Sequence, residues 1–166
     1  MKKLKNAILL SALVSVSACS NSGNPFGGSS NDPIFGNNKG DVSNPTSPAY
    51  FQEAIGDRVL FAIDQSSLGP EAMDLLNSQA TWLMTNGDYK IIVEGHADEQ
   101  GTRDYNVALG ARRANSVKEY LNSLGVAATR IQTVSYGKER PIEICSKESC
   151  YSVNRRAVTV LNNLGS

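Results

Sequence analysis

The chain contains few of the features on which many protein functions depend. It has one histidine, one tryptophan and three cysteines among its 166 residues. A catalytic zinc site needs three protein ligands, and the HExxH motif is absent. The GxSxG motif of nucleophilic hydrolases and the glycine-rich phosphate loop are absent too. These absences argue against the common hydrolytic and nucleotide-dependent chemistries, so we expect a protein that is not an enzyme and needs no cofactor.

The chain also lacks an excess of positive charge. It carries 16 lysines and arginines against 16 aspartates and glutamates, and Lys2, Lys3 and Lys5 lie within the first five residues. Without residues 1–18, 13 basic and 16 acidic residues remain, so the shortened chain has a net charge of −3. A mildly acidic protein lacks the surplus cations that displace counterions from nucleic-acid phosphates. We therefore expect no nucleic-acid partner.

Residues 1–18 have the pattern of an export signal. The three lysines precede an apolar stretch at 7–16, which is shorter than the roughly 20 residues of a transmembrane helix. Val16-Ser17-Ala18-Cys19 resembles the bacterial lipobox, in which the cysteine is acylated and becomes the new N-terminus. The resemblance implies that Cys19 anchors the chain by lipid, and Ser20 after it favours the outer membrane, with the protein facing the periplasm. The alternatives are an ordinary export signal with a chance cysteine, and a buried core helix.

Residues 19–49 are expected to form a flexible tether. Gly, Pro, Ser and Asn make up 21 of the 32 residues from 19 to 50, without a helical or alternating apolar pattern. Too few large apolar groups are present to offset the entropy that ordering would cost. A coil of about 40 residues spans roughly 35 Å on average and up to about 130 Å when extended. Such a tether lets a domain at 50–166 work away from the membrane that holds it.

The domain alternates between strand and helix signals. Pro70 suits a first helical turn, Thr102 is a plausible N-cap, and Gly125 is typical of a helix end. Apolar residues recur at helical spacing at Met73, Leu76, Ala80 and Leu83. The expected elements are strands at 58–63, 90–94, 131–136 and 157–161, and helices at 70–86 and 102–124. This β-α-β-α-β-β order predicts an α+β fold with a mixed four-stranded sheet and helices packed on it.

The second expected helix carries a charge on its apolar face. On a helical wheel Arg113 falls in the stripe formed by Leu109, Val117, Tyr120 and Leu124, whereas Arg112 points well away. Because a guanidinium keeps its charge, Arg113 needs a carboxylate partner or an incoming anion. Asn106 lies two turns earlier on the same face. The N-terminal half of this helix is therefore the part where we expect a ligand.

The loop that leads into this helix supplies the opposite charge. Asp98 follows the strand at 90–94, and a strand end beside a helix N-terminus is a common ligand position. A cleft with Asp98 on one wall and Arg113 on the other would suit a zwitterion, because a carboxylate binds an ammonium and a guanidinium binds a carboxylate through two parallel bonds. The alternative is an internal Asp98–Arg113 salt bridge with no ligand.

Four segments resemble the OmpA-like domain family. They are Val93-Glu-Gly-His-Ala-Asp98, Tyr105-Asn-Val-Ala-Leu-Gly-Ala-Arg-Arg-Ala114, Val134-Ser-Tyr-Gly-Lys138 and Asn154-Arg-Arg156. The resemblance covers roughly residues 58–161 and implies non-covalent binding of peptidoglycan through the meso-diaminopimelate of its stem peptide. Asp98 stands at the family position that faces the diaminopimelate ammonium, and Arg113 at the position that faces its carboxylate.

The same resemblance implies roles for neighbouring residues and a partner. Asn106 is expected to line the pocket or to hold the helix start, and backbone donors near Gly101 and Thr102 to help bind the ligand. Asp64 matches an acidic family position in the first strand, although the two residues before it depart from the family pattern. Together with the lipid anchor, the resemblance implies a link between outer membrane and cell wall in envelope integrity and cell division, with a TolB-type periplasmic protein as a partner.

Three further features leave alternatives open. Cys145 and Cys150 are expected to form a disulfide in an oxidising periplasm, with two free thiols as the alternative. Of Arg155 and Arg156, we expect one to be structural and the other to be exposed. Glu94, His96 and Asp98 would share one face if their strand continued, and such residues can ligate zinc. Since a lone histidine at a strand end is more often a loop support, we expect no metal.

Overall fold

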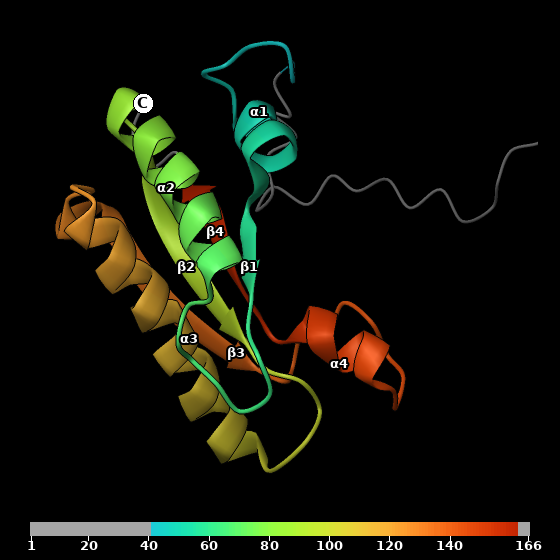
Figure 1. Cartoon of the computed structure of the whole chain (residues 1–166). Helices are drawn as coiled ribbons and strands as arrows, with labels where there is room; N and C mark the ends of the chain where they lie inside the picture. The colour runs from blue at the N-terminus through green and yellow to red at the C-terminus, as the bar shows by residue number, and fades with distance from the viewer. Residues whose placement is uncertain (1–40, 163–166) are drawn as a thin grey trace, which may run out of the picture. The chain divides into compact units, whose positions relative to one another are not determined.

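The computed structural model describes residues 41–162, which form an α+β domain around one four-stranded sheet (Figure 1). The elements are α1 (Pro48–Tyr50), the π-helical turn η1 (Phe51–Gly56), β1 (Arg58–Leu60), α2 (Pro70–Thr85), β2 (Lys90–His96), α3 (Arg103–Ser123), the 3-10 turn η2 (Ala128–Arg130), β3 (Ile131–Gly137), α4 (Glu148–Asn154) and β4 (Arg156–Asn162). The expected export signal, Cys19 and most of the expected tether lie outside the described residues.

The sheet is mixed, which confirms the predicted fold class. Its strand order is β1-β4-β2-β3, with β2 parallel to β3 and antiparallel to β4, and β4 antiparallel to β1. Parallel neighbours need a crossover connection, and α3 supplies it between β2 and β3. Figure 1 shows α2 and α3 side by side along the sheet. This arrangement brings the start of α3 next to the end of β2.

The predicted elements lie close to their expected positions. Helix α2 begins at Pro70, and the Thr102 hydroxyl caps α3 by accepting the Tyr105 N–H at 3.3 Å. Strand β1 ends at Leu60, three residues before the expected end. Leu60 pairs with Arg156, the first residue of β4, so the partner strand stops there.

The sequence did not indicate the helical segment at 48–56. Trp82 on α2 donates its ring N–H to the Pro45 carbonyl at 2.6 Å, and its ring packs on Phe51 with centroids 4.9 Å apart. Ala49 is buried as well. The packed part of the chain therefore begins before Tyr50, the boundary expected between tether and domain. Burial against α2 outweighs a local composition that favours coil.

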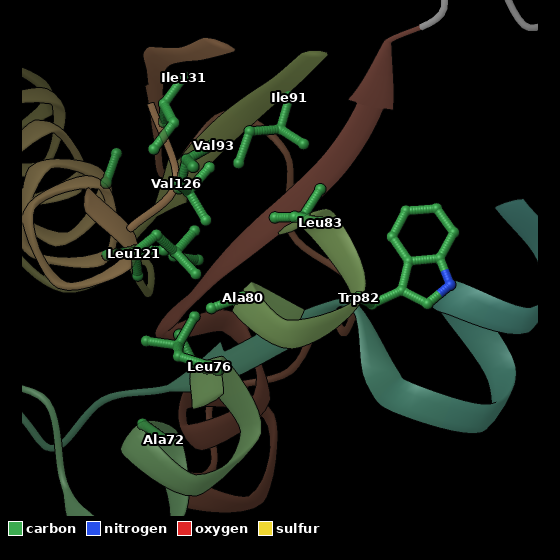
Figure 2. Packing of buried hydrophobic residues seen from close by; sticks show 14 of the residues in the cluster. Ala72, Leu76, Ala80, Trp82, Leu83, Ile91, Val93, Leu121, Val126 and Ile131 are labelled. Carbon is green, nitrogen blue, oxygen red and sulfur yellow. The ribbon is translucent and has the colours of Figure 1, made fainter. Parts of the chain in front are cut away.

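The core lies between the sheet and the helices. Figure 2 shows Leu76 and Leu83 of α2 facing Ile91 of β2 and Leu121 of α3, and all four are buried. Deeply buried apolar side chains of this kind contribute about 1.5–3 kcal/mol each to the free energy of unfolding. Leu76, Ala80 and Leu83 form a core stripe, as the periodicity predicted, whereas Met73, expected in the same stripe, is 37% exposed.

Two glycines set the distance between α3 and β2. A Cβ atom on Gly95 would lie 1.8 Å from the Gly110 carbonyl oxygen, and a Cβ on Gly110 would lie 2.8 Å from the Gly95 carbonyl oxygen. Only residues without a side chain allow backbones to approach so closely. The contact holds the third turn of α3, which carries Arg113, directly over the end of β2.

Candidate ligand site at the start of α3

Arg113 is the most deeply buried charged residue of the candidate site. Its side chain has no exposed surface, which confirms that it lies on the inward face of α3. Backbone carbonyls accept its hydrogen bonds: Nε donates to Gln65 at 2.8 Å, Nη1 to His96 at 2.8 Å and Nη2 to Ala62 at 3.3 Å. The guanidinium thus ties α3 to the end of β2 and to the loop after β1.

The buried guanidinium remains charged. Burial lowers the pKa of Arg113 to about 10, and the nearby Asp98 and Asp64 carboxylates counteract that effect. A guanidinium has five N–H donors, of which three bind the carbonyls above. Within residues 41–162, no carboxylate forms an ion pair with Arg113. Its positive charge is balanced by carbonyl dipoles and by carboxylates that act from a distance.

Asp98 is bound to a different arginine from the one expected. Its Oδ1 accepts the Gln100 backbone N–H at 3.1 Å, and its Oδ2 accepts Nη1–H of Arg155 at 3.1 Å. The internal Asp98–Arg113 salt bridge considered above is therefore not formed in the described part of the chain. The Asp98 carboxylate still acts on Arg113 from a distance, because it opposes the lowering of the Arg113 pKa by burial.

The expectation that one of Arg155 and Arg156 would be exposed is wrong. Both are buried, at 4% and 6% relative exposure. Arg155 donates through Nε to the Phe61 carbonyl at 3.1 Å and also contacts Glu148, whereas Arg156 donates to the Arg140 carbonyl at 3.1 Å. The segment from residue 140 to α4, which the sequence did not indicate as structured, folds back over both guanidinium groups.

Asn106 and Thr102 hold the loop before α3. Asn106 is buried, and its Nδ2 donates to the Gln100 carbonyl at 2.7 Å, so it closes the loop that carries Asp98. The Thr102 hydroxyl is engaged as the helix cap. Lys138 donates to the Gly101 carbonyl at 2.7 Å from the other side. These contacts show how the loop shape is maintained.

Asp64 lies in the loop after β1. It is exposed, accepts a short hydrogen bond from the Tyr105 hydroxyl, and has a φ angle of 56°. Aspartate tolerates this left-handed region better than most residues. The same loop supplies the Ala62 and Gln65 carbonyls that cover Arg113. Asp64 therefore belongs to the covering loop, and its carboxylate raises the pKa of Tyr105.

Sequence reasoning missed Glu148, whose carboxylate contacts Arg155 next to Asp98. The available signal was its spacing of seven residues from Arg155, which puts both on one side of a helix of two turns. A helix as short as α4 has almost no periodicity from which to be recognised. The bond between Cys145 and Cys150 spans the start of this helix in the structure.

The zinc-ligand arrangement considered for Glu94, His96 and Asp98 is not assembled. Strand β2 ends at His96, the His96 Nε2 lies 3.6 Å from Glu94, and Asp98 is turned toward Arg155. Among residues 41–162, no group of three histidine, cysteine, aspartate or glutamate side chains could hold a metal ion. Over the same residues, no helix has both the length and the apolar character needed to cross a bilayer.

Comparison with known proteins agrees with this architecture. Residues 60–156 match the OmpA family. A peptidoglycan-associated lipoprotein from Mesorhizobium japonicum is 46% identical over 96% of this chain and 92% of its own length. One from Agrobacterium fabrum is 51% identical over 73% of this chain and 68% of its own.

Solved structures show the same fold. The crystal structure of the peptidoglycan-associated lipoprotein from Burkholderia pseudomallei aligns with a TM-score of 0.65 at 34% identity, over 73% of this chain and 98% of that one. The C-terminal domain of Helicobacter pylori MotB shares the fold with a TM-score of 0.60 at 21% identity, over 64% of this chain and 84% of that one. The fold and the family match thus define a domain of the OmpA type. The chain belongs to the OmpA family and, within it, to the peptidoglycan-associated lipoproteins.

Proposed function

We propose that this protein binds peptidoglycan non-covalently through meso-diaminopimelate of the stem peptide. One observation carries the proposal: a charged, fully buried Arg113 shares a site with Asp98 and has no carboxylate in contact among the described residues. The family supports the class of ligand, since its members are named for their association with peptidoglycan.

The charges of the site match a zwitterion. Arg155 is bound by two carboxylates, Asp98 and Glu148, so this trio has one negative charge in excess. Arg113 adds one positive charge nearby. A ligand with an ammonium and a carboxylate side by side has no net charge. Each of its two groups has a charge opposite to that of the protein group it would meet. The free end of the diaminopimelate side chain has this structure.

In the proposed complex the ligand ammonium binds Asp98 and the ligand carboxylate binds Arg113. Arg113 is covered by the Ala62 and Gln65 carbonyls, so the carboxylate reaches it when the loop after β1 moves aside. Asp64 on that loop and Asn106 beneath the Asp98 loop border the ligand, and the N–H groups of Gly101 and Thr102 at the start of α3 help to orient it. Charge-assisted contacts of this kind contribute about 1.5–3 kcal/mol each. No covalent bond is made or broken.

At the level of the envelope, we propose that acylated Cys19 anchors the protein in the outer membrane and that residues 19–40 bridge the distance to the wall. Reversible binding of the domain then links membrane and wall mechanically. The family also supports a place in a Tol–Pal system, with a TolB-type periplasmic protein as partner, in envelope integrity and cell division. Cys19→Ser is expected to release the protein from the membrane fraction, and continued membrane fractionation would refute the anchor.

The ligand itself provides the cleanest test of the site. Lysine-type peptidoglycan lacks the distal carboxylate of diaminopimelate but is otherwise similar. Titration of the purified full chain with muropeptides of the two types should show binding at least about tenfold weaker for the lysine type, which corresponds to one lost charge-assisted contact. Equal affinity for both would refute the assignment of Arg113 to the ligand carboxylate, and no protein variant is needed to decide.

A pair of neighbouring arginines supplies the protein control. Arg113→Ala should abolish most pull-down by purified sacculi, while Arg112→Ala, which removes an exposed charge one residue earlier, should bind like the parent protein. Circular dichroism of both variants reports whether the fold is kept. Full sacculus binding by folded Arg113→Ala would exclude the proposed site.

A further inference from the structure

A small covalent loop lies directly against the Asp98 loop. The Cys145–Cys150 disulfide closes a segment that contains Ser146 and Glu148. Glu148 contacts Arg155, which donates to Asp98 at 3.1 Å. The neighbouring Glu99 accepts hydrogen bonds from the Ser146 hydroxyl at 3.2 Å and from the Tyr151 hydroxyl at 2.9 Å. Residues 146–151 thus contact Glu99 directly and reach its neighbour Asp98 through Arg155.

The disulfide closes residues 145–150 into a small ring and so restricts the conformation of the loop, while side-chain contacts attach the loop to the rest of the domain. Residues 146–149 are exposed, α4 has no side-chain cap at Lys147, and within the helix only Cys150 and Asn154 are buried. A further attachment is Asn154, whose side chain accepts the Ile142 N–H at 2.7 Å and donates to the Glu143 carbonyl at 2.8 Å. A cross-link over so few residues acts by restricting local conformations. Without it, Glu148 would lose its fixed place beside Arg155.

We propose that the Cys145–Cys150 loop is a positioning element for the Asp98 carboxylate, and that Glu148 is its positioning residue. Glu148 and Asp98 both pair with Arg155, so the positive charge of Arg155 does not fully neutralise Asp98. Asp98 therefore keeps negative charge with which to bind a ligand cation. This role rests on the proposed function, because it concerns how well Asp98 receives the ammonium of the ligand. Glu148 itself does not touch the ligand.

The test is a double-mutant cycle in the purified full chain. The parent protein, Cys145→Ser with Cys150→Ser, Glu148→Gln, and the combination of all three are titrated with a diaminopimelate-containing muropeptide. Each of the first two changes should raise the Kd by about fivefold to tenfold, and the combination should raise it by little more than either, because both remove the same contact. Glu143→Gln, an exposed glutamate just outside the disulfide, is the matched control and should leave the Kd unchanged.

The Gln100 amide reports the position of Asp98 without any ligand, since it donates to Asp98 Oδ1. Its hydrogen exchange should quicken in both variants and stay unchanged in Glu143→Gln. A Kd within about twofold of the parent for Glu148→Gln would overturn the proposal, and so would fully additive effects. If the cysteine variant does not fold, Glu148→Gln decides, because its disulfide is intact. Failure of the parent protein to bind would instead refute the proposed function, and the positioning role with it.

Discussion

Asp98 and Arg155 lie 57 residues apart in the chain and form a buried ion pair at 3.1 Å. The pair joins the loop after β2 to the residue before β4, and it therefore attaches the Asp98 loop to the sheet. Arg113, the other charge expected to face Asp98, is held by three carbonyls instead. The two guanidinium groups therefore have different partners: Arg155 binds the Asp98 carboxylate, whereas Arg113 is fully buried and binds backbone carbonyls.

Asp98→Asn should lower the stability of the domain as well as its binding. The amide keeps the shape of the side chain but leaves Arg155 with Glu148 as its only carboxylate partner among the described residues. We expect a loss of about 2 kcal/mol in the free energy of unfolding, as for other buried hydrogen bonds to a charged group. Urea unfolding measures it, and Asp88→Asn at an exposed position is the control. An unchanged unfolding free energy for Asp98→Asn would show that the ion pair does not hold the loop.

Gly95→Ala should damage the fold severely. The added methyl group would lie 1.8 Å from the Gly110 carbonyl oxygen, so α3 must move away from β2. Such overpacking costs about 3 kcal/mol, and thermal unfolding should show it as a clear drop in Tm. Gly87→Ala is the matched control, because nothing lies within 4 Å of the atom it adds. Equal Tm values for the two variants would mean that Gly95 does not set the distance between α3 and β2.

Removal of residues before Tyr50 should destabilise the domain. A chain that starts at Tyr50 loses the Pro45 carbonyl that accepts from Trp82, together with the buried Ser47 and Ala49. One hydrogen bond and the buried apolar surface correspond to roughly 2 kcal/mol. Guanidinium unfolding of a chain from Tyr50 and of one from Asp41 compares the two starts. If both unfold at the same denaturant concentration, residues 41–49 contribute nothing to stability.

His96 should make the domain less stable in mild acid. Burial lowers its pKa from the ordinary 6.5, and the charges of Arg156 and Arg140 lower it further, while Glu94 opposes them. The unfolded chain therefore takes up a proton near pH 6.5 that the folded protein does not, so the free energy of unfolding falls as the pH drops below that value.

The expected slope from this one group is at most about 1.4 kcal/mol per pH unit. Urea unfolding between about pH 7.5 and pH 5.5 measures it. His96→Gln cannot take up the proton, so its stability should change less over the same interval. An equally steep loss in the variant would assign the pH dependence to other groups.

The local sequence pattern was sufficient to predict the main helices and strands, because the residues that start, continue and end each of them lie close together in the chain. Pro70 and the stripe of Leu76, Ala80 and Leu83 specify α2, and Thr102 with Gly125 bounds α3. The inward position of Arg113 follows from the same 3.6-residue period. The motifs around Asp98 and Arg113 also indicate the family.

Helix α4 and the segment before β1 were missed for the opposite reason. Each is short and has a coil-like composition, so its conformation depends on distant partners. The contacts of Trp82 with Pro45 and of Tyr151 with Glu99 are examples. A prediction from neighbouring residues has no access to such contacts.

By itself, the sequence determined the order of the four strands and of α2 and α3, the face of α3 that carries Arg113, and the loop that carries Asp98. All of these depend on periodicity and end signals within one segment. Only the tertiary structure decided which charges meet. Asp98 binds Arg155 and Arg113 binds carbonyls because the strand order β1-β4-β2-β3 brings the start of β4 beside the end of β2. The partners of a buried charge are set by which chain segments become neighbours on folding, and spacing along one helix does not contain that information.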